Sequence, residues 1–153
     1  FAPPRKRRTC SPRGSAADLI VDTGVLLVAA DRSDPDHTSC RELLETHSGP
    51  PIATALAIAE AGWPTDRQLG PMAEAALYES AAAGENRVEP LSAADWTRSA
   101  GLIIQYADRH LGGVDSSLLA TAERLGATSI GTLDRRHFSL VRPQHIAGFE
   151  LLP

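Results

Sequence analysis

The sequence has few aromatic residues, few cysteines and no long apolar run. Aromatic residues make up 5% of the 153 positions, while segments rich in Ala, Glu and Leu recur, which favours several helices over a many-stranded sandwich or barrel. The two cysteines, Cys10 and Cys40, have neither a CxxC nor a paired metal-ligand spacing, so we expect free thiols in a reducing cytosol. No apolar segment approaches the length of a membrane span, and the basic N-terminus lacks the apolar core of a signal peptide. We therefore expect a cytoplasmic protein.

Positive charge is also scarce outside the first residues. The net charge is -4, but residues 1–17 contain five basic residues and no acid, which leaves -9 for residues 18–153. We expect residues 1–17 to be a disordered basic extension and residues 18–153 to form one domain. An acidic domain of this kind would need cations at its active site if it acted on nucleic acid.

Short apolar segments alternate with helical patterns along the domain. We expect strands near residues 18–22, 52–54, 87–90, 127–133 and 149–153. We expect helices over residues 25–30, around Cys40 to Leu44, over 55–63 with Pro64 ending or kinking the helix, over 71–83, over 93–110 behind a capping box of Ser92 and Asp95, and over 114–125. The alternation predicts an α/β fold, a three-layer α/β/α sandwich around a central parallel sheet.

Two acids stand where functional residues gather in such a sheet, just beyond the carboxyl ends of strands. Asp22 follows the apolar segment Leu19 to Val21, and Asp134 follows the strand predicted at 127–133. Each also has an ordinary interpretation, because Asp22 could be a helix N-cap and Asp134 a turn residue or half of a surface ion pair.

Two further acids lie on helices. Asp115 occupies the first turn of its helix, on the side that carries Leu119 and Ala122, so we expect it to point inward, although a first-turn Asp also stabilises a helix N-terminus. Glu60 is the only charged residue between Thr54 and Asp66, and we expect it to be buried on the apolar side of its helix.

Four acids that converge would repel one another, and a hard divalent cation such as Mg²⁺ or Mn²⁺ would relieve that repulsion. The five histidines show no HxxxH or HxH spacing, which argues against zinc. The Asp22-Thr23-Gly24 triplet also occurs in aspartic proteases, but a helix is predicted directly after it. A phosphotransferase with a nucleophilic Asp22 would lack a nearby lysine, because the only lysine is Lys6.

Three segments together resemble the PIN-domain family, and within it the VapC-type toxins of bacterial toxin–antitoxin pairs. These are LIVDTGVLLVAADRSDPDH, AIAEAGW and GGVDSSLLATAERLGATSIGTLDRRHF, and the resemblance covers about residues 18–153. By matching motif it implies that Asp22, Glu60, Asp115 and Asp134 bind Mg²⁺ or Mn²⁺, with Thr23 and Thr132 as weaker candidates. The chain has Ser116 and Ser117 where many relatives carry a further acid.

The resemblance implies cleavage of RNA, by hydrolysis of a phosphodiester with a metal-activated water. Arg135 and Arg136, beside the acids, could contact substrate phosphates, or could belong to a solvated turn. The expected partners are an RNA substrate, a cognate antitoxin protein and a second copy of the chain. The alternative is a PIN-like module of weak catalytic activity that binds a partner protein or RNA.

Overall fold

The computed structural model describes residues 18–153, and their centre is a five-stranded parallel sheet. The basic extension at residues 1–17, with Cys10, lies outside the described residues. The strand order is β3-β2-β1-β4-β5, and every neighbouring pair is parallel. The strands are β1 (Leu19–Val21), β2 (Ile52–Thr54), β3 (Arg87–Glu89), β4 (Ser129–Gly131) and β5 (Glu150–Leu152).

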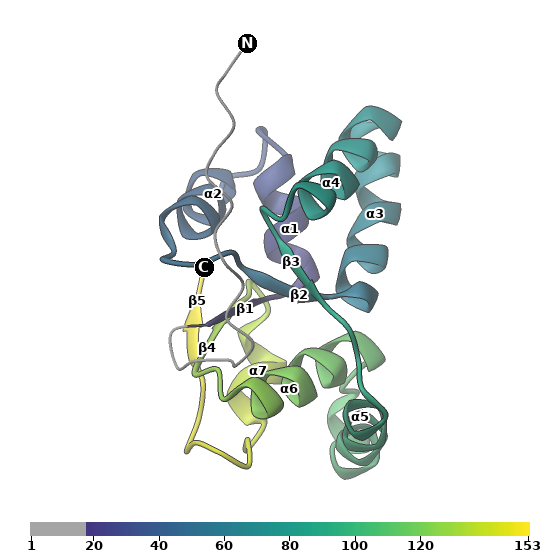
Figure 1. The fold of residues 1–153 in the computed structure, drawn as a ribbon, viewed down its shortest axis with the longest axis vertical. Helices are drawn as coiled ribbons and strands as arrows, with labels where there is room; N and C mark the ends of the chain where they lie inside the picture. The colour runs from purple at the N-terminus through teal and green to yellow at the C-terminus, as the bar shows by residue number, and fades with distance from the viewer. Residues whose placement is uncertain (1–17) are drawn as a thin grey trace.

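The helices cover both faces of this sheet. Figure 1 shows α1 to α4 on one side of the strands and α5 to α7 on the other. Their bounds are α1 Thr23–Ala30, α2 His37–Thr46, α3 Ala55–Leu69, α4 Pro71–Ala83, α5 Ala93–Gln105, α6 Gly113–Leu125 and α7 Arg135–Leu140, with a short 3₁₀ helix at Ala107–Arg109. The predicted three-layer α/β/α sandwich is confirmed.

The strand order creates a switch point between β1 and β4. The chain passes from β1 outward through β2 to β3, and then returns across the sheet to β4 on the other side of β1. The connections that leave β1 and β4 therefore run to opposite faces, and ligands of open α/β sheets bind in the crevice formed at such a point. Asp22, immediately after β1, and Thr132, immediately after β4, stand at its rim.

The core lies between the sheet and its two helix layers. Its largest fully buried side chains include Phe138, Leu19, Ile20, Ile52 and Leu118. Cys40 is a free thiol in the buried core. In residues 18–153, no helix combines the length and apolar character needed to cross a bilayer.

The sequence predicted that Pro64 would end or kink the third helix. Pro64 does not end it, so the first of these two predictions was wrong. Helix α3 continues through Pro64 to Leu69. Proline removes one backbone donor, and the carbonyl that loses its partner is that of Glu60, four residues earlier on an exposed part of the helix. Water can solvate that carbonyl, and the next residue, Thr65, adds a hydrogen bond from its hydroxyl to the Ala61 carbonyl at 2.8 Å.

The capping box of the fifth helix is confirmed, but its length was overestimated. Ser92 Oγ accepts a hydrogen bond from the Asp95 amide at 3.2 Å, and the Asp95 carboxylate accepts one from the Ser92 amide at 2.8 Å. The helix ends at Gln105, and the chain turns at His110, whose φ of 56° is left-handed. Helix α7 was not predicted, because its six residues are too few to show a periodic pattern.

Candidate functional site

Asp22 lies directly after β1 and is 8% exposed. Its Oδ1 accepts a hydrogen bond from the Thr23 amide at 2.7 Å, which makes Asp22 the N-cap of α1. Its Oδ2 accepts a hydrogen bond from Thr132 Oγ1, after β4, at 2.9 Å. The N-cap interpretation is therefore correct, and it does not exclude a role in the site, because the carboxylate also reaches across the switch point.

Glu60 is exposed, so the prediction that it is buried on an apolar helix side was wrong. The packed side of α3 carries Ala57, Ile58 and Ala61, whereas Trp63, one turn beyond Glu60, is 67% exposed. A helix that is apolar nearly all round does not specify which side faces the core. Glu60 nevertheless reaches the switch point, because its Oε2 accepts a hydrogen bond from Thr23 Oγ1 at 2.6 Å.

Asp115 lies in the first turn of α6, and its side chain is 19% exposed, which agrees with the predicted inward direction. Its Oδ2 lies 2.8 Å from Nδ1 of His137. The same nitrogen is 3.8 Å from Oδ2 of Asp134. Asp134 caps α7, since its Oδ1 accepts a hydrogen bond from the Arg136 amide at 3.0 Å, and its side chain is 54% exposed.

The carboxylates repel one another. Burial raises the pKa of Asp22 from 3.8 to about 6, and the negative charges of Asp115 and Glu60 add to the increase, while hydrogen bonds from Thr132 and from the Thr23 amide oppose it. Burial also raises the pKa of Asp115, with His137 opposing, and Glu60 and Asp134 contributing to the increase. Asp134 is coupled to the group through Asp115 and His137.

No basic side chain other than His137 compensates this group within residues 18–153. The ion pairs of the described arginines go to other acids, namely Glu45, Glu89, Asp95, Asp108 and Glu123. Asp22, Glu60, Asp115 and Asp134 are the residues that the sequence singled out, and we call them the acidic group. The acidic group is an uncompensated concentration of negative charge at the carboxyl edge of the sheet.

The acidic group fits a hard divalent cation by the chemistry of its donors. In residues 18–153, no three His, Cys, Asp or Glu side chains converge as a ready-made metal site. Mg²⁺, however, usually keeps several waters and takes only one or two protein carboxylates. Among the described residues, Asp115 Oδ1 and Glu60 Oε1 have no hydrogen-bond partner, so each is an oxygen ligand that a cation could use.

Sequence reasoning missed His137. Histidines were considered only for paired zinc-type spacings, and His137 has none. The available signal was its position three residues after Asp134, which places the two side chains on neighbouring positions if a helix begins at Asp134. Arg135 and Arg136 are exposed beside the acidic group, and neither forms an ion pair with a described residue.

The serines that replace the further acid of many relatives are part of the core. Ser116 and Ser117 are fully buried. Ser116 Oγ donates to the Gly113 carbonyl at 2.9 Å, and Ser117 Oγ donates to the Val114 carbonyl at 2.7 Å. Both hydroxyls stabilise the first turns of α6, and neither extends the acidic group.

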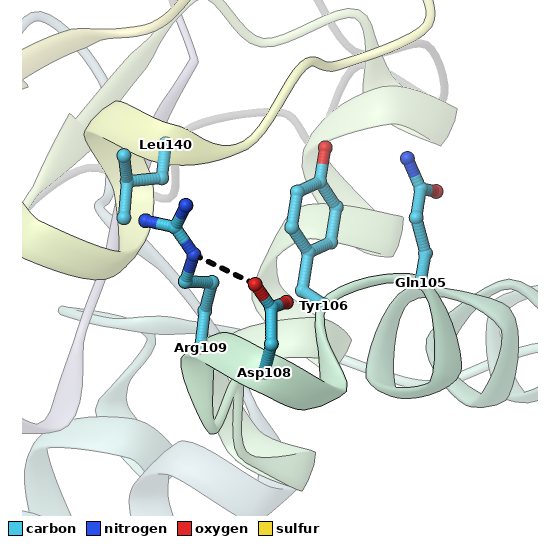
Figure 2. Close-up of a pocket in the computed structure, with 5 residues that line it drawn as sticks. All are labelled: Gln105, Tyr106, Asp108, Arg109 and Leu140. Atoms are coloured by element: carbon cyan, nitrogen blue, oxygen red, sulfur yellow. Dashed lines mark hydrogen bonds and ion pairs between the residues drawn. The ribbon is translucent and has the colours of Figure 1, made fainter.

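A separate hollow of about 220 Å³ lies between the 3₁₀ helix and the end of α7, as Figure 2 shows. It is lined by Gln105, Tyr106, Asp108, Arg109 and Leu140. Arg109 Nε is 3.0 Å from Asp108 Oδ2, so the two charges in this hollow compensate each other. It contains no member of the acidic group and offers no comparable chemistry.

Comparison with known proteins agrees with this fold. The PIN domain family matches residues 19–142. Ribonuclease VapC26 of Mycobacterium tuberculosis (strain ATCC 25618 / H37Rv) is 30% identical over 135 residues, which cover 88% of this chain and 100% of that relative.

Solved structures share the fold at lower identity. The crystal structure of Mycobacterium tuberculosis VapC20, described as a sarcin-ricin loop cleaving toxin, superposes with a TM-score of 0.69 at 17% identity over 74% of this chain and 87% of that one. DNA-bound VapBC from Salmonella typhimurium gives a TM-score of 0.60 at 17% identity, over 88% and 96% of the two chains. From the family match and the relative aligned over its whole length, we conclude that this chain belongs to the PIN-domain family and groups there with the VapC-type proteins.

Proposed function

We propose that this protein is a divalent-metal-dependent endoribonuclease that hydrolyses RNA phosphodiester bonds and acts as the toxin of a toxin–antitoxin pair. The observation that supports this most strongly is the acidic group, four carboxylates uncompensated by any described arginine at the switch point of a parallel sheet. A structural cluster of acids would be expected to carry its own counter-charges. The similarity to Ribonuclease VapC26 supports the reaction class.

In this proposal Asp22, Glu60, Asp115 and Asp134 hold Mg²⁺ or Mn²⁺. The cation would lower the pKa of a water for attack on the phosphodiester and neutralise charge on the phosphoryl group. The protein fixes the ligands: Thr132 donates to Asp22 at 2.9 Å, and Thr23 donates to Glu60 at 2.6 Å. These hydroxyls orient the carboxylates without adding charge.

The proposed substrate is single-stranded or looped RNA, because an open edge reads exposed backbone more easily than a duplex interior. Arg135 and Arg136 are suited to phosphate contacts, since they are exposed at the N-terminus of α7 beside Asp134 and form no ion pair with a described residue. Phosphate contacts of this kind position a nucleic acid without reading its sequence.

The proposed protein partners are a cognate antitoxin and a second copy of this chain. Similar solved structures include VapBC from Salmonella typhimurium and VapBC2 from Rickettsia felis. An arginine from an antitoxin would supply the positive charge that the acidic group lacks. Exposed apolar side chains such as Met72, at 82%, and Ile104, at 78%, are available for protein contacts.

The test is cleavage of a mixed RNA pool by the purified chain with Mg²⁺ or Mn²⁺, then with EDTA, beside Asp22→Asn. We expect cutting that requires both the metal and Asp22. Glu45→Gln is a suitable control, because this exposed acid pairs with Arg41 on α2, outside the acidic group. Equal cutting by wild type and Asp22→Asn would contradict the assignment of Asp22.

One observation favours the alternative of a binding module with weak catalysis. Within the described residues, no three acidic or histidine side chains form a ready-made metal site. That alternative predicts a folded wild type that never cuts RNA with either metal, yet still binds RNA or a partner protein. The cleavage assay therefore separates the two functions.

A further inference from the structure

His137 is the only basic side chain among residues 18–153 that lies within ion-pair distance of two members of the acidic group. Its Nδ1 is 2.8 Å from Asp115 Oδ2 and 3.8 Å from Asp134 Oδ2. Only the shorter distance is within hydrogen-bonding range, so Nδ1 faces Asp115 rather than Asp134. Asp134 has its own donor, the Arg136 amide.

The short helix that carries His137 is anchored on both sides of that residue. Asp134 caps α7 at its N-terminus, and Phe138, the residue after His137, is 1% exposed in the core. His137 is 28% exposed at its side chain and Asp115 is 19% exposed, so this contact is more enclosed than the surface ion pairs that contribute little to stability. The backbone position of His137 is thus set by the fold itself.

Three carboxylates of the acidic group, those of Asp22, Glu60 and Asp115, each have one side-chain partner. Thr132 donates to Asp22, Thr23 donates to Glu60, and His137 is the donor for Asp115. Within the described residues, Asp115 has no other side-chain partner, and its Oδ1 carries no hydrogen bond. Asp115 Oδ2 therefore faces His137, and Asp115 Oδ1 is free to bind a cation.

We propose that His137 is a positioning residue, whose Nδ1 proton holds one oxygen of Asp115 so that the other oxygen faces a bound divalent cation. This inference rests on the proposed function, because it assumes that the acidic group binds a metal. Neutral imidazole is sufficient for the role, since its Nδ1–H tautomer donates one hydrogen bond. Donors that orient metal-binding carboxylates typically contribute 10-fold to 100-fold to metal affinity.

The experiment is Mn²⁺ titration followed by electron paramagnetic resonance of the free ion, with three substitutions at position 137. The amide nitrogen of Asn is the same number of bonds from Cα as Nδ1 of His, whereas that of Gln matches Nε2. We expect His137→Ala to bind Mn²⁺ about 10-fold to 100-fold more weakly than wild type. We expect His137→Asn to stay within about 3-fold of wild type, because it keeps the Nδ1-like donor, and His137→Gln to resemble His137→Ala.

The matched control is His47→Ala, since His47 lies at the end of α2 and its Nδ1 contacts only the Gly49 carbonyl and amide. It should bind Mn²⁺ like wild type. Circular dichroism of every variant establishes that it is folded, and the two amide variants remain informative if His137→Ala does not fold.

Three results would overturn the inference. These are wild-type Mn²⁺ affinity in folded His137→Ala or His137→Gln, rescue by Gln in place of Asn, or a hyperfine coupling from imidazole nitrogen to Mn²⁺, which would make His137 a ligand. Failure of the proposed function looks different. A wild type that binds Mn²⁺ but cuts no RNA contradicts the nuclease and leaves the role of His137 intact, whereas a wild type that binds no Mn²⁺ contradicts both.

Discussion

The protein contains two clusters of acidic side chains that differ in their counter-charges. In the first, which we call the arginine network, Glu89, Asp95 and Glu123 pair with three arginines, Arg87, Arg98 and Arg124, where β3, α5 and α6 meet. Arg98 Nε is 2.7 Å from Glu123, and Arg124 is 2.9 Å from both Asp95 and Glu89. In the second, the acidic group, the side-chain donors are two threonine hydroxyls and one histidine.

We interpret the difference as one between a cluster that stabilises the fold and a cluster that, in our proposal, binds a cation. In the arginine network opposite charges hold together elements that are distant in sequence, since Arg98 and Glu123 join α5 to α6. In the acidic group, burial and like charges raise the pKa of Asp22 to about 6, so the folded chain retains electrostatic repulsion. A cation from outside the chain can relieve that repulsion.

The largest expected effect is on RNA cleavage. Asp22→Asn, Glu60→Gln and Asp115→Asn should each reduce metal-dependent cleavage by roughly 100-fold or more, since each removes a proposed cation ligand. Asp134→Asn should have the smallest effect of the four, because the Asp134 side chain is 54% exposed and its carboxylate already caps α7.

Initial rates with Mg²⁺, corrected for the folded fraction, measure this effect. Glu123→Gln, in the arginine network, should cut at the wild-type rate under the same correction. Full activity in any variant of the acidic group would remove that residue from the site.

The next effect is on stability, where the two clusters should respond with opposite signs. Glu123→Gln should lower the free energy of unfolding by about 1–3 kcal/mol, because Arg98 loses its charged partner. Asp22→Asn should raise it in metal-free solution by at most about 3 kcal/mol, because Asp22 has a pKa about two units above its ordinary value.

Urea unfolding at pH 7.5 with EDTA compares the two variants with wild type. If both substitutions lower the free energy of unfolding equally, electrostatic repulsion in the acidic group does not destabilise the folded state. The two clusters would then not differ in their effect on stability.

The advantage of Asp22→Asn should depend on pH. The pKa of Asp22 is about 6 in the folded chain against an ordinary value of 3.8, so between these pH values the folded state binds a proton that the unfolded chain does not. Wild-type stability therefore increases relative to Asp22→Asn as the pH falls through 6. The unfolding free energy of Asp22→Asn should exceed that of wild type by its largest amount above pH 6, and the excess should disappear below about pH 4. Urea unfolding at several pH values measures this difference. A difference that stays constant with pH would contradict the raised pKa.

The smallest expected effect concerns the arginines beside the acidic group. Replacing Arg135 and Arg136 together with Ala should weaken RNA binding a few-fold and make it less sensitive to salt, since two phosphate contacts are lost. Filter binding of uncleaved RNA by an Asp22→Asn background measures this. Arg41→Ala is the control, because Arg41 pairs with Glu45 on α2. An unchanged salt dependence would show that both arginines are only solvated residues at the start of α7.

Much of the fold was predictable because strand and helix patterns alternate clearly. The positions of Asp22 and Asp134 after strands follow from the short apolar segments that precede them, and the capping box at Ser92 marks a helix start. The exposure of Glu60 was not predictable, since an alanine-rich helix presents apolar residues on every side. His137 was missed because α7 is too short to be recognised before its capping residue is known.

The acidic group itself remains a prediction as a metal site, and the most direct test of it is metal-dependent thermal unfolding of three proteins. Wild type, Asp22→Asn and Glu123→Gln are heated with EDTA and then with increasing Mn²⁺. We expect Mn²⁺ to raise the unfolding temperature of wild type and Glu123→Gln by similar increments, because a ligand that binds only the folded state stabilises it, and to leave Asp22→Asn almost unchanged. Equal stabilisation of Asp22→Asn and wild type by Mn²⁺ would show that the metal binds elsewhere and would contradict the account.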